Sequence, residues 1–266
     1  MPVILAHGQP KSGSSFLFQV AQHAAELNNR KPTGVLRSEL REKLDGDWAN
    51  YRETVDAAYL RSVLSVLPPH EVAVVKTHAA LDPETLPLIT ARSVIAFTSV
   101  RDPRDAALSM VDTGVRDAEA NSSREFFKRF VTVDQRETLA AQRHASRILR
   151  TYVKKPGILV IPHEATAYAE ARVIRRLADH IRLGRHTRQL VATFAKRPKH
   201  TILEFNKGQA FRFATELEPS VIQRLNRGLK DEIAFADATI RDAMASLSLL
   251  HRYLAIRIRH REVLSL

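Results

Sequence analysis

The chain has 266 residues, of which 44% are hydrophobic and 26% charged, as is ordinary for a soluble globular protein. It contains no cysteine, which excludes disulfides, thiolate catalysis and thiolate metal sites. No stretch approaches the roughly 18 to 20 apolar residues of a membrane span, and the first residues lack the pattern of a signal peptide. We therefore expect a cytoplasmic protein with a single domain over residues 1–266.

The charge is strongly basic. The chain has 41 lysine and arginine residues against 29 acidic residues, a formal net charge of +12. Such an excess favours anionic partners such as a nucleotide, a nucleic acid or an acidic lipid surface. A solvated basic surface with no specific partner accounts for the charge equally well.

The first predicted element is a strand over Val3 to Leu5, followed by the loop GQPKSGSS. A nucleotide-binding loop of the G-x-x-x-x-G-K-[ST] kind has its lysine after the second glycine, whereas Lys11 comes before Gly13. Backbone amides of such a loop, with the hydroxyls of Ser14 and Ser15, can bind an anion. Apolar residues then recur at helical spacing, at Phe16, Val20, Ala24 and Leu27.

A second buried strand is predicted over Glu71 to Val75, and the polar residues Lys76 and His78 follow it. A lone histidine is more often a packing or surface residue than a catalytic one. At the carboxyl end of a strand that faces an anion-binding loop, however, His78 is a candidate general base.

A third strand is predicted over Val94 to Val100. Arg101 follows it, and Ser109 lies about two helical turns further on, so that both side chains can reach one phosphate. We interpret Asp102 and Arg104 as helix-end caps and surface pairs.

The remaining elements are a fourth strand over Ile158 to Ile161, a weaker candidate strand and several helices. The weaker strand is Thr201 to Phe205, and the helices are Leu139 to Tyr152, Ala171 to Leu183 and one with the apolar residues Val221, Leu225 and Leu229. Thr215 and Glu218 form a candidate capping box before that last helix, and Pro219 suits its first turn. Alternating strands and helices predict an α/β fold with a doubly wound parallel sheet, in which ligands bind at the carboxyl ends of the strands.

The residues after the strands are mostly cationic. A magnesium-dependent phosphoryl transferase needs a carboxylate there, yet the strands lead into Lys76, Arg101 and the pair His163 and Glu164. Glu164 alone could serve. The pattern predicts anion chemistry with no metal.

At these positions the chain resembles the sulfotransferases that use 3'-phosphoadenosine 5'-phosphosulfate (PAPS). PKSGSSFL is similar to their PKSGTTWL loop, KTH to their KTH or KSH element, and RDPRDAALS to their RNPRDVAVS segment. The three segments occur in the same order. The resemblance implies a P-loop NTPase-like three-layer sandwich, a central parallel sheet flanked by helices.

The resemblance also implies roles for individual residues. His78 would remove the acceptor's proton, and Lys11 would stabilise the charge on the leaving 3',5'-bisphosphate. The 5'-phosphosulfate would contact the loop residues Lys11, Ser12, Gly13, Ser14 and Ser15, and the 3'-phosphate Arg101 and Ser109. Lys76 is a further candidate for binding the cofactor. Phe16 replaces a tryptophan that stacks on adenine, and IPHEAT replaces the family's YED.

A softer resemblance lies near the C-terminus. The segment FNKGQAFRFATELEP is similar to the family's RKGxxGDWKNxFTxE region, which makes Lys207 and Gly208 candidates for the 3'-phosphate. Asn206 replaces the arginine of that region. ATFAK, around Phe194, is similar to a segment that covers the other face of adenine.

The acceptor is open at this point. A small molecule, a carbohydrate or a lipid would fit, and an aromatic cage is less expected because only 6% of residues are aromatic. We expect no nucleic-acid partner. The run LLHRYLAIRIRHREVL could touch an anionic membrane, although a packed terminal helix with a solvated basic face is the more common structure. Two alternative functions remain: an ATP-dependent kinase-like phosphotransferase, and a non-catalytic binder of nucleotides or polyanions.

Overall fold

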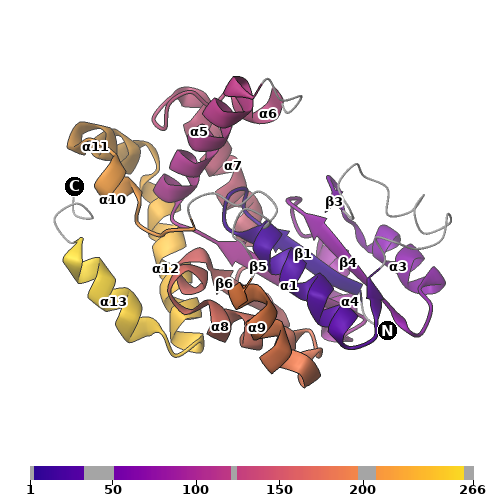
Figure 1. The fold of residues 1–266 in the computed structure, drawn as a ribbon. Helices are drawn as coiled ribbons and strands as arrows, with labels where there is room; N and C mark the ends of the chain where they lie inside the picture. The colour runs from indigo at the N-terminus through magenta and orange to yellow at the C-terminus, as the bar shows by residue number, and fades with distance from the viewer. Residues whose placement is uncertain (1–2, 33–50, 121–124, 197–207, 261–266) are drawn as a thin grey trace.

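A parallel sheet forms the centre of the molecule (Figure 1). The computed structural model describes residues 3–32, 51–120, 125–196 and 208–260. The sheet has six strands in the order β2-β4-β1-β5-β6, with β3 also paired to β4, and these pairings are all parallel. The strands are β1 (Val3–Gly8), β2 (Lys31–Pro32), β3 (Tyr51–Arg52), β4 (Glu71–Thr77), β5 (Val94–Val100) and β6 (Ile158–Pro162).

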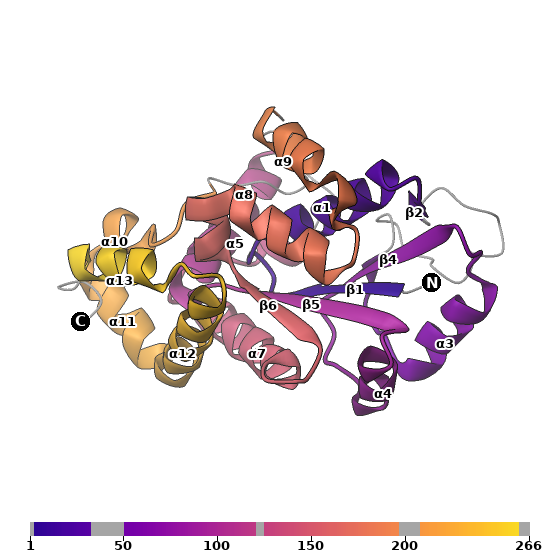
Figure 2. The ribbon, with the colours of Figure 1, turned by 90° about the horizontal axis from the view of Figure 1, so that it is seen from below.

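Helices cover both faces of this sheet. Seen along the sheet edge, α1, α8 and α9 lie on one side and α3, α4, α7 and α12 on the other, while α10, α11 and α13 gather beyond β6 (Figure 2). The helices are α1 (Ser14–Leu27), α3 (Ala57–Val66), α4 (Leu86–Thr90), α5 (Pro103–Glu119), α6 (Glu125–Lys128), α7 (Arg136–Tyr152), α8 (His163–His180), α9 (Thr187–Lys196), α10 (Phe213–Glu216), α11 (Pro219–Gly228), α12 (Lys230–Ser246) and α13 (Leu250–Arg259). The predicted α/β sandwich is confirmed.

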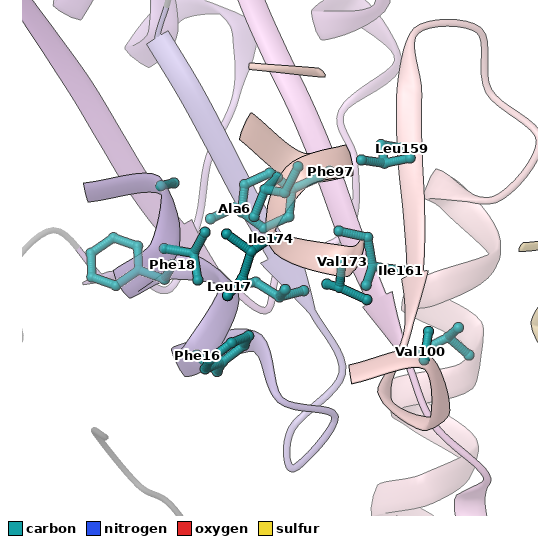
Figure 3. Packing of buried hydrophobic residues seen from close by; sticks show 14 of the residues in the cluster. Ala6, Phe16, Leu17, Phe18, Phe97, Val100, Leu159, Ile161, Val173 and Ile174 are labelled. Atoms are coloured by element: carbon teal, nitrogen blue, oxygen red, sulfur yellow. The ribbon is translucent and has the colours of Figure 1, made fainter. Parts of the chain in front are cut away.

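The two faces of β1 enter different hydrophobic clusters. Ile4 and Ala6 pack with α1 and α8, whereas Val3 and Leu5 pack on the opposite side with α3 and α4. This division follows from the strand repeat of two residues. Figure 3 shows the first cluster, in which Leu17 of α1 lies close to Ala6 of the sheet.

All four predicted strands are present, and three of them extend beyond the predicted ends. β1 continues to Gly8, β4 to Thr77 and β6 to Pro162. The additional residues include buried polar ones. Thr77 donates to the Arg52 carbonyl, and His7 Nδ1 bonds to the Thr98 hydroxyl, while His7 Nε2 has no hydrogen-bond partner among the described residues. The weaker strand, Thr201 to Phe205, lies outside the described residues.

Two helix predictions need correction. Helix α8 begins at His163 instead of Ala171, and non-helical dihedral angles at Ala169 interrupt it, so that the apolar repeat used for the prediction follows the interruption. The capping box is also wrong. Thr215 lies within α10 and donates to the Arg212 carbonyl, and Glu218 itself precedes α11, whose first residue is Pro219 as expected.

Within the described ranges, every helix is too short or too polar to cross a membrane.

Candidate active site

The loop between β1 and α1 turns sharply at two residues with positive φ. Lys11 has φ 65° and Gly13 has φ 85°, in the left-handed region that glycine adopts without strain. Ser12 holds the turn from inside, since its hydroxyl donates to the Gln9 carbonyl at 2.6 Å. Helix α1 begins directly after Gly13, so its first N–H groups, which have no partner within the helix, belong to this loop. The geometry is that of an anion-binding loop.

Gly8 lets this loop approach β5. A Cβ atom there would lie 2.1 Å from the Ser99 hydroxyl oxygen and 2.6 Å from the Ser14 Cβ. The Ser12 and Ser99 hydroxyls are 2.5 Å apart and share a hydrogen bond, which joins the loop to the end of β5.

Lys76 lies at the edge of the same loop. Its side chain is buried, and its ammonium donates to the Ser15 hydroxyl at 2.7 Å. A lysine is rarely buried without using its charge. This one adds positive charge at the first turn of α1, where a phosphate would also meet the helix dipole.

His78 follows β4 and is half-buried. Its Nδ1 lies 2.5 Å from the Gly8 carbonyl oxygen. Because a carbonyl only accepts hydrogen bonds, Nδ1 carries the proton in the neutral ring, and Nε2 is then the basic nitrogen. The hydrogen bond also fixes the ring beside the first residue of the loop, and the Tyr51 ring lies 5.5 Å away.

A second histidine, His7, lies behind this site. It is fully buried, stacks on Tyr152 with 3.7 Å between ring centroids, and bonds to the Thr98 hydroxyl at 2.7 Å. Burial lowers its pKa well below the usual value, and the nearby His78 lowers that pKa further. His7 is therefore neutral. Tyr152 in turn donates to the Ala79 carbonyl, next to His78, at 3.1 Å.

Arg101 joins the loop to the C-terminal part of the chain. Its guanidinium donates to the Lys11 carbonyl at 3.0 Å and to the Gln209 carbonyl at 2.8 Å. Its Nε is buried and makes no hydrogen bond with the described residues. Ser109, on α5, is buried.

The segment from Gly208 to Phe213 is held against α5 by Asp105. The Asp105 carboxylate accepts the backbone N–H of Phe211 at 2.6 Å and that of Phe213 at 3.0 Å. This places Gln209, and with it Gly208, which has φ 62°, near Arg101. Lys207 lies outside the described residues.

The interpretation of Asp102 and Arg104 is correct in one part and wrong in another. Asp102 does cap α5, since it accepts the backbone N–H of Arg104 at 2.9 Å. The pair is not on the surface, however: both residues are buried, and the Arg104 guanidinium lies 3.9 Å from the centre of the Phe213 ring. Burial acts to raise the pKa of Asp102, but Arg104 outweighs it and lowers that pKa.

His163 and Glu164 begin α8 on the far side of the loop. The His163 ring packs against Gly13, where a Cβ would lie 3.4 Å from its Cδ2. Burial, with the cations Arg101 and Arg212, lowers the pKa of His163 well below its usual value. Glu164 Oε1 accepts the backbone N–H of Asp102 at 3.2 Å. Burial raises the pKa of Glu164 to about 8, so this carboxyl is mostly protonated at neutral pH.

The two predicted adenine-stacking residues contact each other. The rings of Phe16 and Phe194 are both buried and meet edge to face, with 5.4 Å between centroids. An adenine ring inserted between them would require the two phenylalanine rings to separate. An adenine ring that packs on one of them would require no such separation.

Lys11 lies beside an aromatic group that the sequence analysis did not anticipate. Its ammonium is 4.3 Å from the centre of the Phe127 ring, a cation–π contact. Phe126 packs edge to face on Phe127, and Phe130 packs on it at a tilt of 56° between the ring planes. Phe126 is 51% exposed. The low overall aromatic content made an aromatic surface less expected. It did not show that three phenylalanines lie close together in one short segment, and such a segment gives no periodic signal.

Three further residues at the site were not predicted from the sequence. They are Gln9, His7 and Asp105, whose carboxylate holds the backbone of Phe211 and Phe213. Gln9 was within the quoted loop, but its bond to Arg101 joins two distant segments and leaves no mark on local spacing. No cluster of three or more histidine, aspartate or glutamate residues suited to a metal ion occurs among the described residues.

No protein-family model matches the sequence, and no curated protein matches it either. Solved structures do match. The structure of retinol dehydratase in a complex with retinol and PAP aligns over 86% of this chain and 80% of its own, with a TM-score of 0.50 and 18% identity.

The chain has the fold of retinol dehydratase. Two weaker alignments have TM-scores of 0.49 and 0.46, and the fold assignment does not rest on them. They are mouse sulfotransferase SULT7A1 complexed with PAP (13% identity, 90% of this chain and 86% of that chain) and retinol dehydratase with androsterone and inactive cofactor PAP (17% identity, 86% and 80%). Because β1 pairs in parallel with β4 and β5, the loop after β1, the end of β4 and the start of α5 lie at one edge of the sheet.

Proposed function

We propose that this protein is a PAPS-dependent sulfotransferase, with His78 as general base and Lys11 stabilising the leaving phosphate. The observation that carries the proposal is the hydrogen bond from His78 Nδ1 to the Gly8 carbonyl. It presents the basic Nε2 of the ring at the start of a loop built to hold an anion.

The residues present fit a nucleotide with phosphates at both ends. The loop from Ser12 to Ser15, with Lys76, supplies amides, hydroxyls and a cation for the 5' end. Arg101, with its buried Nε, supplies a donor for the 3'-phosphate. His163 Nδ1 is buried nearby and also makes no hydrogen bond with the described residues. When bound, PAPS would supply a sulfuryl group on a good leaving phosphate.

The protein's part in the reaction is proton transfer and charge stabilisation. His78 Nε2 takes the proton of the acceptor hydroxyl as that oxygen bonds to sulfur, and the bond from sulfur to the 5'-phosphate oxygen breaks. Lys11 and the loop amides stabilise the negative charge that the bisphosphate gains. His7, held neutral behind His78, allows the His78 ring to take up positive charge without a second cation beside it.

An acceptor with an apolar body suits the surroundings of Lys11. The aromatic side chains of α6 adjoin the lysine, and Phe126 offers an exposed ring. Retinol, in the matched complex, is an apolar alcohol. Small-molecule alcohols are therefore the first acceptors to screen, ahead of carbohydrates and lipids.

Calorimetric binding of 3',5'-ADP, 5'-AMP and ATP with magnesium tests the donor assignment. We expect 3',5'-ADP to bind most tightly, without metal. A preference for ATP with magnesium would favour the kinase-like alternative, and no binding at all would favour a scaffold without this chemistry.

Substitution of His78 tests the base. His78→Ala should lower turnover by roughly 10²- to 10⁴-fold, the usual contribution of a general base, with nearly unchanged affinity for 3',5'-ADP. Equal turnover in the variant would remove His78 from the mechanism. His144→Ala, on α7, is a matched control.

A further inference from the structure

Helix α13 lies at one end of the molecule, on the outside of the group of helices beyond β6 (Figures 1 and 2). Of its ten residues, Tyr253 alone is buried. Leu250 and Ile256 pack against the core beside Tyr253, whereas the apolar residues Leu254, Ala255 and Ile258 are exposed.

The inner side of α13 is held firmly. The Tyr253 hydroxyl donates to Asp237 of α12 at 2.8 Å. Arg257 pairs with the same carboxylate and donates to the Tyr253 hydroxyl at 3.2 Å. These contacts fix the rotation of the helix about its own axis, and so determine which residues face outward.

The outward side combines apolar and basic residues. Leu254 is 40% exposed and Ile258 is 71% exposed. They share one face with Ala255, because Ile258 lies four residues after Leu254 and three after Ala255. Arg252 and Arg259 are exposed along the flank of this face. The helix sequence, LHRYLAIRIR, contains no acidic residue.

We propose that this outward face of α13 binds the surface of an anionic lipid bilayer. Amphipathic helices bind there by inserting apolar side chains below the headgroups while arginines remain among them. Leu254 and Ile258 are placed to insert, and Arg252 and Arg259 to contact lipid phosphates. The protein's net charge of +12 adds long-range attraction.

A second copy of the chain fits this face less well. In a two-fold symmetric contact the same patch faces itself. His251, Arg252 and Arg259 would then meet the same basic residues of the other copy, with no carboxylate on the helix to compensate. The charge of the face is complementary to acidic lipid instead.

Vesicle co-sedimentation of the full chain tests the proposal. The probes are vesicles of phosphatidylcholine alone and of phosphatidylcholine with 30% phosphatidylglycerol, each at low and high salt. We expect binding to the anionic vesicles that weakens with salt. Arg252→Gln and Arg259→Gln should each weaken it roughly fivefold, and Leu254→Ser with Ile258→Ser by ~10-fold or more.

Matched controls come from α3, which Figures 1 and 2 place at the opposite end of the molecule. Val66 is 38% exposed and Arg61 is exposed, so Val66→Ser and Arg61→Gln should leave vesicle binding unchanged. Circular dichroism checks that each variant folds. The proposal is overturned if the wild type binds neither vesicle or binds both equally, or if the α13 variants bind as the wild type does. It is also overturned if Leu254→Ser with Ile258→Ser converts a dimer into a monomer by light scattering.

Discussion

Gln9 Oε1 accepts a hydrogen bond from the backbone N–H of Arg101 at 3.2 Å, although the two residues are 92 positions apart. Both residues are buried. The next N–H, that of Asp102, is bound in the same way by Glu164. The turn that presents Arg101 is therefore held by side chains from the ends of β1 and β6, and the proposed 3'-phosphate site is tied to the loop proposed to hold the 5' end.

Gln9→Leu should loosen this turn. The variant leaves the Arg101 N–H buried without its acceptor, which costs about 1–3 kcal/mol in the free energy of unfolding. Chemical denaturation measures this cost. Calorimetry should show a larger loss of affinity for 3',5'-ADP than for 5'-AMP. Gln189→Leu, at an exposed position on α9, is the control, and equal losses for both nucleotides would contradict the coupling.

Arg101→Gln tests the phosphate contact directly. Loss of a charge-assisted hydrogen bond should weaken 3',5'-ADP binding by about 1.5–3 kcal/mol and 5'-AMP binding much less. Because Arg101 also bonds to two backbone carbonyls, a general loss of structure would weaken both nucleotides alike. The informative quantity is the ratio of the two affinities, and an unchanged ratio would rule out the assignment. Arg185→Gln serves as an exposed comparison.

The raised pKa of Glu164 predicts that the free energy of unfolding depends on pH. Its pKa is raised by burial to about 8 in the folded protein, from 4.5 as the ordinary value. The folded state therefore binds more protons than the unfolded state between these values. The stability contributed is fully present below about pH 4.5 and is lost as the pH rises towards 8. Glu164→Gln mimics the protonated side chain and cannot ionise.

The measurement is the difference in unfolding free energy between Glu164→Gln and the wild type at pH 5 and pH 8. This difference should move in favour of the variant at pH 8 by a few kcal/mol, since one pKa unit corresponds to about 1.4 kcal/mol. Glu218→Gln, at an exposed carboxylate, should show no such change. A difference that stays constant with pH would mean that Glu164 is ionised in the folded protein.

Gly114→Ala should disturb the aromatic group beside Lys11. A Cβ at this position of α5 would lie 2.4 Å from the Phe127 carbonyl oxygen and 2.7 Å from that of Phe130. Backbone atoms cannot yield as side chains do, so α6 must shift, at a cost of about 1–3 kcal/mol. Denaturation measures the cost. If Phe127 also positions Lys11, turnover should fall while the affinity for 3',5'-ADP changes little. The control is Ala118→Gly, which perturbs α5 without introducing a clash. Gly184→Ala is not suitable as a control, because Asp179 would crowd the added Cβ.

Sequence patterns were sufficient to predict the four longer strands of the sheet, but not the two-residue strands β2 and β3. Continuous apolar runs such as Val94–Val100 are fully buried in a parallel sheet, so that every residue contributes to the signal. The order of the loop, KTH and the Arg101 segment likewise predicted that they would meet, because parallel strands bring their carboxyl ends to one edge.

The start of α8 was not predictable in this way. His163 and Glu164 are polar and buried, and neither follows the apolar repeat. His163 packs against Gly13, and Glu164 accepts the Asp102 N–H. The aromatic group around Phe127 was missed for a related reason, since its packing depends on contact with Gly114 and Lys11. Long-range contacts of single polar or aromatic residues have no local sequence pattern.

The clamp formed by Asp105 has a consequence for biosynthesis. Its carboxylate is fully buried, and the two N–H groups that satisfy it come from residues 106 and 108 positions later in the chain. A nascent chain that has emerged only as far as β6 can pair its central strands. Its Asp105 carboxylate then has the Arg101 guanidinium at 3.6 Å but lacks both N–H donors, and Arg101 lacks the Gln209 carbonyl. Completion of the proposed nucleotide site therefore requires that Phe213 has emerged, and we expect a shorter nascent chain to lack the proposed activity.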